Sequence, residues 1–508
     1  MQVSALIKGI EGTVIEGAPD TEVNGIVCDS RKVARGSLFI AIPGLKADGH
    51  NYLAGAAGKG AAALVIQDGF KTETLPSGCC VIRVPDTRLA LAHIAAAFHG
   101  HVTRELCLIG ITGTNGKTTC SFLIESILKA CGLSAGVIGT VNYRFNSEIR
   151  KAGFTTPDPL ELQSLLRQMA DKEVSHVVME VSSHALDQDR VDFCEFDCAL
   201  FTNLSRDHLD YHLDLEHYFR CKERLFTTIL EASRAKKTRS VINADDPWGR
   251  KLMETQRGRL LTHGLESPGA HIAARNVSIG LDGIKAEIVT PGGTFSFQSP
   301  LLGKYNLYNI LAASSVGIAL GLPCEEIRRG IETLNGVPGR IERIENRHGA
   351  TVLVDYAHTP DALENVLNTI KALNPNRIIS VFGCGGNRDQ GKRPLMGRIA
   401  AEYSQLAIVT SDNPRDEDPF GIMSQIEDGI KTSCVRKFQA AELMGNGCER
   451  GYAVIPDRRE AIRLAARVAK PGDVVLIAGK GHEDYQIIKG NILPFDDRLE
   501  AKHAFGCM

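Results

Sequence analysis

Apolar runs of strand length alternate with amphipathic segments through the middle of this chain. Residues 135–140, 176–180 and 198–204 are mostly apolar, whereas 159–172 carries its apolar residues at helical spacing. Strands that are apolar on both faces and separated by helices are typical of parallel sheets with helices on both sides. The pattern therefore predicts an α/β protein with a mostly parallel central sheet.

The pattern changes near both ends of the chain. The first hundred residues contain short β-like runs between glycine-, proline- and aspartate-rich turns, and they end in an alanine-rich helical segment. After Val337-Pro338-Gly339, three apolar strands each lead into a polar or glycine-rich loop, at 378–389, 406–416 and 474–484. Ligands of such open sheets bind beyond the C-terminal strand ends. We expect three domains, at 1–100, 101–337 and 338–508.

The composition excludes some classes of function. The 508 residues are 43% hydrophobic and carry a formal net charge of −2, which gives no electrostatic reason to expect nucleic-acid or membrane-surface binding. No apolar run approaches the roughly 20 residues of a membrane span, and the N-terminal segment lacks the features of a secretory signal. We therefore expect a cytoplasmic protein without membrane insertion.

Cysteine is frequent, but its placement indicates little chemistry. The chain has 14 cysteines and no CxxC pair, so a zinc site has weak support from the sequence. Most of the cysteines lie inside apolar runs, which favours small buried thiols.

A phosphate-binding loop is the most specific signal. Gly113-Thr114-Asn115-Gly116-Lys117-Thr118-Thr119 follows an apolar strand and opens an amphipathic helical segment. In that context backbone N–H groups and a helix N-terminus cradle phosphate, while Lys117 reaches the β- and γ-phosphates and the Thr118 hydroxyl holds Mg²⁺. The general pattern would place a glycine where Ile111 stands. The segment predicts a nucleotide triphosphatase core.

Acids and histidines after the next strands are candidates for metal binding. Glu180 ends the strand at 176–180, where a carboxylate would hold Mg²⁺ directly or through water. The alternative is an ordinary strand-end glutamate at the surface. His208 lies with Asp207, Asp210 and His212 in one polar segment, which fits either a metal site or a solvated loop.

Two arginines follow strand ends in the C-terminal third. Arg388 and Arg415 would each present a planar fork to a carboxylate, and Glu483 would meet an ammonium group. The alternative for either arginine is an exposed, salt-bridged side chain. The glycine loops at 383–386 and 479–481 lack a Lys-Ser/Thr pair, so we expect no second nucleotide site.

Ordered motifs along essentially the whole chain carry a family resemblance. They are Asp29-Ser30-Arg31 with GSLFIAIPGLKADGHNY, TGTNGKTT, TTPD, MEVSSHAL, TNLSRDHLDYH, DYAHTPDAL, GCGGNRDxGKRPLM, DNPR and GKGHEDYQ. With these motifs the chain resembles the Mur ligases of bacterial peptidoglycan synthesis. The shortened phosphate loop is this family's own form.

The resemblance implies a three-domain α/β fold. Its parts are an N-terminal mixed α/β domain that binds the UDP-muramoyl substrate, a central P-loop ATPase with a mostly parallel sheet, and a C-terminal Rossmann-like domain that brings the amino acid. It also implies an ADP-forming amide ligase that adds meso-2,6-diaminopimelate to UDP-N-acetylmuramoyl-L-alanyl-D-glutamate through an acyl phosphate. ATP and two Mg²⁺ ions would be its cofactors. Its partners would be small-molecule substrates, with no nucleic acid, and the protein would be a monomer serving cell-wall synthesis, cell shape and cell division.

The resemblance further assigns roles to individual residues. Catalysis would rest on Lys117, Glu180, His208 and Lys222, and the metal ions on Thr118, Glu180, His208 and Lys222 as its carbamate, N6-carboxylysine. Besides Gly113 to Thr119, ATP would contact Asn309, Arg340 and Asp355. The UDP-muramoyl dipeptide would contact Ser30, Thr155, Thr156, Ser182, Gln188 and Arg190, and diaminopimelate would contact Arg388, Asp412, Asn413, Pro414, Arg415, Gly479 and Glu483. Without the resemblance, Lys222 would be interpreted as an exposed helical lysine.

Other assignments explain fewer of these motifs. In the family DNPR accompanies meso-diaminopimelate, and Arg415 would pair with the carboxylate that lysine lacks; lysine-adding relatives lack this arginine.

DNPR and GKGHEDYQ argue against the ligase that adds D-Ala-D-Ala. A regulatory GTPase would need an Asn-Lys-x-Asp motif, and the chain has no Asn-Lys dipeptide. A non-catalytic scaffold leaves Glu180, His208 and Lys222 without a use, and a folate polyglutamate ligase leaves the N-terminal motifs without one.

Overall fold

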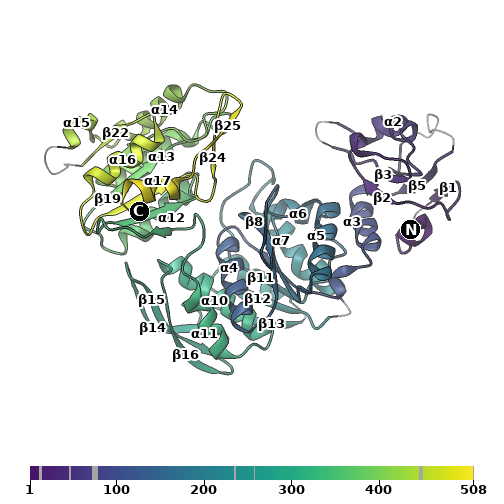
Figure 1. Cartoon of the computed structure of the whole chain (residues 1–508). Coiled ribbons are helices and arrows are strands. Elements are labelled where there is room, and N and C mark those ends of the chain that lie inside the picture. The colour runs from purple at the N-terminus through teal and green to yellow at the C-terminus, as the bar shows by residue number, and fades with distance from the viewer. Residues whose placement is uncertain are drawn as a thin grey trace. The chain divides into compact units, whose positions relative to one another are not determined.

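The computed structural model describes residues 1–10, 14–44, 47–70, 78–233, 236–256, 258–444 and 450–506. Leu45 and Lys46 of the N-terminal motif lie outside these residues. The chain divides into two compact units (Figure 1). Unit 1 comprises Met1–Ala274, Ile288–Phe295 and Asn309–Gly330, and unit 2 comprises Arg275–Glu287, Ser296–Tyr308 and Ile331–Met508.

The N-terminal part of unit 1 is built on a five-stranded sheet in the order β1-β5-β4-β3-β2, in which only the β1–β5 pair is antiparallel. The strands are β1 (Val14–Glu16), β2 (Gly25–Val27), β3 (Ser37–Ile40), β4 (Ala63–Gln67) and β5 (Cys80–Val84). Helices α1 (Val3–Leu6), α2 (Leu53–Gly58) and α3 (Thr87–Phe98) accompany them, with short 3₁₀ turns at Ser30–Lys32, Gly49–Tyr52 and Val102–Arg104. Asp86 caps α3 by accepting hydrogen bonds from the Arg88 and Leu89 amides.

The larger sheet of unit 1 has eight strands in the order β13-β12-β11-β6-β10-β7-β8-β9. They are β6 (Cys107–Thr112), β7 (Ala135–Ile138), β8 (Asn142–Phe145), β9 (Glu148–Lys151), β10 (His176–Glu180), β11 (Cys198–Phe201), β12 (Arg239–Asn243) and β13 (Arg259–His263). Neighbours from β13 to β7 are parallel, whereas β8 and β9 form antiparallel pairs at the edge. The mostly parallel sheet is therefore confirmed, and β11, β6, β10 and β7 deliver their C-terminal ends to one edge.

The helices of this region are α4 (Lys117–Ala130), α5 (Pro159–Asp171), α6 (Ser183–Asp187), α7 (Leu215–Arg224), α8 (Leu230–Ala232) and α9 (Pro247–Glu254). A π-helical turn, Leu225–Ile229, separates α7 from α8. Leu225, Phe226 and Ile229 of this turn are buried in one core cluster with Phe201 and Met179 of the sheet. The position of α7 is thereby set by packing of its C-terminal continuation against the sheet.

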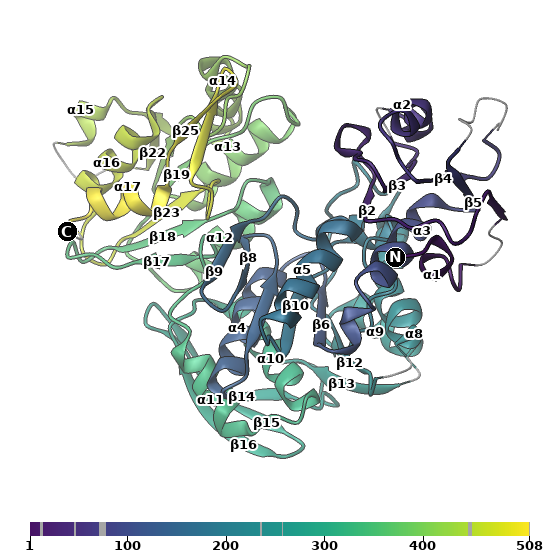
Figure 2. The ribbon, with the colours of Figure 1, turned by 45° about the vertical axis from the view of Figure 1, so that its right-hand side comes forward.

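A three-stranded sheet follows, in the order β14-β15-β16, and its strands lie side by side in Figure 2. They are β14 (Ala273–Gly280), β15 (Gly283–Thr290) and β16 (Gly293–Ser299), and helices α10 (Lys304–Ala319) and α11 (Cys324–Thr333) come next.

Unit 2 is built on a seven-stranded sheet in the order β17-β18-β23-β19-β20-β22-β21. All neighbours except the antiparallel β17–β18 pair are parallel, which agrees with the open α/β sheet expected for the C-terminal third. The strands are β17 (Glu342–Ile344), β18 (Thr351–Asp355), β19 (Ile378–Phe382), β20 (Leu406–Val409), β21 (Arg436–Lys437), β22 (Gly451–Val454) and β23 (Val474–Ala478), with a hairpin of β24 (Tyr485–Ile488) and β25 (Asn491–Pro494). The helices are α12 (Pro360–Lys371), α13 (Lys392–Tyr403), α14 (Pro419–Lys431), α15 (Ala440–Leu443), α16 (Arg458–Val468) and α17 (Asp497–Ala504).

A fully buried ion pair fastens α16 to α17 in unit 2. Arg458 Nε lies 2.7 Å from Asp497 Oδ1, and Nη2 lies 2.6 Å from Oδ2, so the contact is bidentate. Arg458 Nη2 also donates to the Ala478 carbonyl at the end of β23. Of the helices that the structure describes, none combines the length and apolar character needed to cross a membrane.

Candidate active site

The phosphate loop connects β6 to the N-terminus of α4, as the sequence predicts. Gly116 adopts a φ of 89°, and a Cβ there would collide with Asn309 Oδ1 on α10, so the position requires glycine. Lys117 Nζ donates hydrogen bonds to the Gly113 and Thr114 carbonyls at 2.7 and 2.8 Å. The predicted loop residues and Asn309 therefore lie together.

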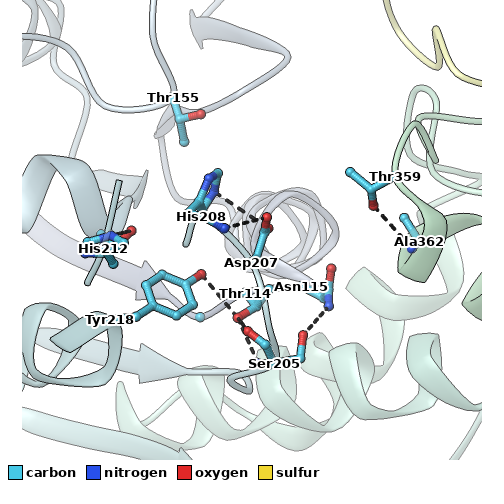
Figure 3. A network of polar contacts seen from close by, with 12 residues as sticks. Thr114, Asn115, Thr155, Ser205, Asp207, His208, His212, Tyr218, Thr359 and Ala362 are labelled. Atoms are coloured by element: carbon cyan, nitrogen blue, oxygen red, sulfur yellow. Dashed lines mark hydrogen bonds and ion pairs between the residues drawn. The ribbon is translucent and has the colours of Figure 1, made fainter. Parts of the chain in front are cut away.

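The loop is fastened to the segment that follows β11. The Thr114 hydroxyl lies 3.2 Å from the Tyr218 hydroxyl and accepts a hydrogen bond from the Ser205 amide, contacts that can be followed in Figure 3. Thr202 Oγ1 donates to the Asn115 carbonyl at 2.7 Å. These contacts hold the loop between two strand ends of the parallel sheet.

Glu180 lies at the end of β10 and is 1% exposed, so its interpretation as a surface glutamate is wrong. Its Oε2 accepts a hydrogen bond from Thr118 Oγ1 at 3.0 Å, and its two oxygens accept from the amide and hydroxyl of Thr140 at 3.0 and 2.9 Å. Thr140 was absent from the sequence prediction. The signal for it was its place at the end of the predicted strand 135–140, which runs parallel to β10.

Lys222 is 1% exposed on α7, so its interpretation as an exposed helical lysine is also wrong. Its Nζ donates to the Gly113 carbonyl at 2.9 Å and lies 4.5 Å from the centre of the Tyr218 ring. Burial, and secondarily the charge of Lys117, hold the pKa of Lys222 well below its ordinary value. The side chain is thus biased toward the neutral amine, which is the nucleophilic form.

His208 lies in the segment that follows β11, with its ring 6.2 Å from that of Tyr218. Its backbone has a φ of 53°, its side chain is 47% exposed, and its Nε2 lies 3.7 Å from Asp207 Oδ2. Figure 3 shows Asp207 and His208 above Tyr218 and Thr114. His212, four residues on, is buried instead, with Nε2 2.9 Å from Ser183 Oγ. In the polar segment 207–212, Asp207 and His208 are therefore accessible to solvent, whereas His212 is buried.

Five of the residues predicted to hold the UDP-muramoyl dipeptide form one connected set: Thr155, Thr156, Ser182, Gln188 and Arg190. The Thr155 hydroxyl lies 3.1 Å from that of Thr140, and Thr156 Oγ1 donates to the Glu180 carbonyl and accepts from the Ser182 amide. Arg190 donates to the Thr156 carbonyl and to Gln188 Oε1. Ser30 lies in the 3₁₀ turn after β2, and within the described part of the chain it makes no hydrogen bond to this set.

In unit 2, Asp355 ends β18 and lies next to the segment that carries Arg340. Its two carboxylate oxygens accept hydrogen bonds from the Ile341 and Ala357 amides at 2.7 and 2.8 Å. Burial raises the pKa of Asp355, whereas the Arg340 guanidinium acts in the opposite direction. Arg340 also lies over the Tyr356 ring, 5.0 Å from its centre.

The DNPR segment follows β20 and packs against the loop after β23. Asn413 joins the two, because its Nδ2 donates to Glu483 Oε2 at 3.1 Å and its Oδ1 accepts from Lys480 Nζ at 2.9 Å. Lys480 is fully buried and lies 3.4 Å from Asp412 Oδ1. Burial, and secondarily Asp412, raise the pKa of Glu483. Lys480 was missed by the sequence prediction, although it stands inside the GKGHED motif.

Arg415 is held in an unusual backbone conformation, with a φ of 53°. Its amide donates to the Ile487 carbonyl at 3.0 Å, and its Nη1 donates to the Gly386 carbonyl at 2.8 Å. A Cβ at Gly386 would collide with the Pro414 carbonyl oxygen, so glycine allows the loops after β19 and β20 to touch. The exposed Arg388 lies on the first of these loops, beside Gly385.

Neither Arg388 nor Arg415 forms an ion pair with any residue that the structure describes, which disfavours the salt-bridged alternative. Gly479 lies against Asp412, since a Cβ there would fall 2.8 Å from Asp412 Oδ2. The predicted set Arg388, Asp412, Asn413, Pro414, Arg415, Gly479 and Glu483 is thus gathered at the C-terminal ends of β19, β20 and β23.

Family models match three successive parts of the chain. They are the Mur ligase family catalytic domain at residues 22–99, the Mur ligase middle domain at 111–317 and the Mur ligase glutamate ligase domain at 339–481. The chain belongs to the Mur ligase family, which confirms the predicted three-domain fold. The exact boundaries at residues 100 and 337 stay predictions.

Relatives match over nearly the full length. A Geobacter metallireducens protein named UDP-N-acetylmuramoyl-L-alanyl-D-glutamate–2,6-diaminopimelate ligase is 50% identical over 506 residues, covering 99% of this chain and 98% of its own. A solved structure of a protein with the same name is 34% identical, with a TM-score of 0.70, and covers 100% of this chain and 99% of its own. The MurF ligase of Thermotoga maritima, solved in complex with ADP, shares the fold at 19% identity and a TM-score of 0.59, covering 96% of this chain and 97% of its own.

Proposed function

We propose that this protein is the ligase that joins meso-2,6-diaminopimelate to UDP-N-acetylmuramoyl-L-alanyl-D-glutamate, with ATP converted to ADP and phosphate. The observation that carries the proposal is the convergence on one phosphate loop of Lys117, the Thr118–Glu180 pair and the buried Lys222 amine. A phosphate-binding lysine, an oxygen pair for a hard cation and a second buried lysine together suit the activation of a carboxylate by phosphoryl transfer.

Magnesium is the cation that these donors fit. The Thr118 hydroxyl and the Glu180 carboxylate are hard oxygen donors that lie 3.0 Å apart beside the loop. His208 lies close enough to Lys117 and Lys222 for their charges to lower its pKa, although burial is the larger cause. Thr118, Glu180, His208 and Lys222 as its carbamate would hold two ions. When bound, Mg²⁺ would neutralise the charge that develops on the phosphates.

The burial of Lys222 supports the proposal that it forms a carbamate. A neutral amine can attack the carbon of CO₂, forming an N–C bond and releasing one proton, whereas an ammonium cannot. Burial favours the neutral form of this side chain. The product, N6-carboxylysine, would replace the neutral amine by a negatively charged group next to the Gly113 carbonyl and supply two oxygen donors.

The first chemical step would take place at the phosphate loop. The D-glutamyl carboxylate attacks the γ-phosphorus of ATP, an O–P bond forms, and the bond to the β-phosphate oxygen breaks with release of ADP. Lys117 is positioned by two loop carbonyls, and its ammonium would turn to the β- and γ-phosphates. Thr155, Thr156, Ser182, Gln188, Arg190 and Ser30 would hold the UDP-linked dipeptide, and Asn309, Arg340 and Asp355 the nucleoside part of ATP.

The second step would consume the acyl phosphate. The amine of diaminopimelate attacks the acyl carbon, and the tetrahedral intermediate collapses to the amide as the C–O bond to phosphate breaks. The carboxyl groups of Asp412 and Glu483 would meet an ammonium group, and Arg415 would present its guanidinium to the second carboxylate. Positioning by these groups would supply most of the rate advantage.

The test is phosphate release from UDP-N-acetylmuramoyl-L-alanyl-D-glutamate, ATP and Mg²⁺, with meso-diaminopimelate, L-lysine or D-Ala-D-Ala offered in turn. We expect turnover with meso-diaminopimelate alone. Turnover with lysine would retain the ligase and contradict the role of Arg415. Absence of turnover with every amine, from protein that binds ATP, would refute the proposed substrates.

The cellular setting belongs to the same proposal. We place the enzyme in the cytoplasm as a monomer, where its nucleotide-linked product would enter peptidoglycan synthesis and so support cell shape and division. The domains at 1–100, 101–337 and 338–508 would bind the UDP-muramoyl substrate, ATP and the amino acid, respectively.

A further inference from the structure

A second group of metal-ligating side chains lies apart from the phosphate loop. His217 and Cys221 are one turn apart on α7, and His212 precedes the helix. His212 Nδ1 lies 3.2 Å from His217 Nδ1 and 3.7 Å from Cys221 Sγ, and Cys221 Sγ lies 3.9 Å from His217 Nε2. Three potential ligand atoms thus converge within 4.8 Å of one another.

The His212–His217 and His212–Cys221 separations are close to those of tetrahedral coordination. The Cys221–His217 distance involves the other ring nitrogen of His217, and one ion can bind only one of these two nitrogens. Bonds of about 2.0 Å to nitrogen and about 2.3 Å to sulfur, at the tetrahedral angle, place two nitrogens about 3.3 Å apart and a nitrogen about 3.5 Å from sulfur. A small cation could be accommodated once the His217 side chain turns to offer one ring nitrogen toward both His212 Nδ1 and Cys221 Sγ. Imidazole and thiolate are the donors that Zn²⁺ and its chemical neighbours prefer, whereas Mg²⁺ prefers oxygen.

The surroundings orient the ligands. His212 Nε2 lies 2.9 Å from Ser183 Oγ, and donation to this oxygen would leave Nδ1 unprotonated toward Cys221 and His217. Asp187 Oδ1 lies 3.5 Å from Cys221 Sγ and 3.9 Å from His217 Nε2, and its other oxygen accepts from the Tyr211 hydroxyl at 2.6 Å. The side chain of His217 is 36% exposed, which gives an ion a path from solvent.

We propose that His212, His217 and Cys221 bind one transition-metal cation of the Zn²⁺ class, with the Asp187 carboxylate beside it. The ion would join the segment after β11, which carries His208, to α7, which carries Lys222 next to Cys221. It would therefore be a structural metal that fixes two segments of the proposed Mg²⁺ site without contacting substrate.

Cobalt is the probe that tests this proposal, because Co²⁺ follows Zn²⁺ in coordination and reports its ligands by absorption. Full-length protein, freed of metal by a chelator and kept in excess Mg²⁺, is titrated with Co²⁺. We expect one equivalent to give the visible bands of tetrahedral cobalt and a thiolate-to-cobalt charge-transfer band, and Zn²⁺ to abolish both by displacement. Absence of these bands in the wild-type protein would overturn the proposal and leave a hydrogen-bonded cluster only.

Two variants locate the ion. Cys221→Ser is expected to remove the charge-transfer band, and His217→Ala to weaken Co²⁺ binding at least about tenfold. His217 is partly exposed on the surface of α7, so its replacement leaves the core intact if the buried Cys221 variant fails to fold. Cys434→Ser, at an exposed cysteine of unit 2, is the matched control and should leave binding and spectrum unchanged. A charge-transfer band that survives Cys221→Ser, an unchanged Co²⁺ affinity in His217→Ala, or loss of the band in Cys434→Ser would refute the assignment.

Discussion

Replacement of Gly386 by alanine tests how the amine-binding loops are positioned. A Cβ at Gly386 would collide with the carbonyl oxygen of Pro414, a backbone atom that cannot rotate away. Normal van der Waals separation would require the loop after β20 to move by on the order of 1 Å. Arg415 is the next residue, and its Nη1 contact with the Gly386 carbonyl would move with it. A displacement of this size commonly lowers activity about 10²-fold.

The expected result is therefore a fall of about 10²-fold in kcat/KM for meso-diaminopimelate, with a loss of about 1–3 kcal/mol in folding free energy from overpacking. Steady-state phosphate release at varied diaminopimelate measures the first quantity, and thermal unfolding measures the second. Gly421→Ala is the matched control, because Gly421 lies in α14 and its Cβ would meet nothing closer than Asp418 Oδ2 at 3.8 Å.

The effect of Gly386→Ala should be limited to the use of diaminopimelate. ATP binding, which we assign chiefly to the phosphate loop of unit 1, should stay within experimental error in both variants. A Gly386→Ala enzyme with the wild-type KM and kcat for diaminopimelate would show that the contact with Pro414 does not position the amine, and it would remove the DNPR loop from the proposed site.

Four further substitutions probe other contacts. Glu180→Gln keeps the shape of the side chain but removes its charge, so phosphate release should fall by about 10²-fold or more; wild-type turnover would exclude a metal role. Lys222→Ala should lower turnover similarly and abolish any carbamate signal after incubation with ¹³C-bicarbonate, and persistence of that signal would place it elsewhere. Arg415→Ala should raise the KM for diaminopimelate about 10²-fold and leave ATP binding unchanged. An unchanged KM would contradict the role of Arg415 in binding the amino acid. Arg458→Met leaves the carboxylate of the buried Asp497 without its ion-pair partner, so it should destabilise unit 2 by about 3–5 kcal/mol, or about 6–20 °C in Tm. Arg463→Met, at an exposed position of the same helix, should change stability by less than about 0.5 kcal/mol.

Strand ends were the part of the site that sequence could predict. Glu180 ends an apolar run and Arg388 and Arg415 follow such ends, and parallel strands bring these positions to one edge of a sheet. Asp412 and Gly479 were expected only from the family resemblance. The partners of these residues were harder to predict. Thr140 and Lys480 are recognised only when strand order is known, because it decides which loops meet.

Helix α7 shows a different reason for missing residues. Lys222 falls on the same helical face as Tyr218 and Leu225, so its burial could have been inferred from spacing. A lysine on an apolar face was nevertheless interpreted as solvent-exposed, since burial of its charge is unfavourable. Likewise, His217 and Cys221 have the i, i+4 spacing of a helical ligand pair, which a search for CxxC motifs does not detect.

The π-helical turn after α7 makes the chain sensitive to a one-residue deletion at this point. Each residue of a regular helix rotates the next by about 100°, and a π turn accommodates one extra residue between two helical segments. Here Lys222 lies before the turn, whereas Ile229 and Leu230 lie within and after it and are packed into the core. Loss of a single codon between residues 225 and 229 would restore a regular helix and rotate α7 relative to Ile229 and Leu230, which would move Lys222 away from Gly113 and Tyr218 and Phe219 out of their core positions. Such a deletion should therefore harm both the site and the core, so selection should preserve the number of residues in this turn more strictly than their identity.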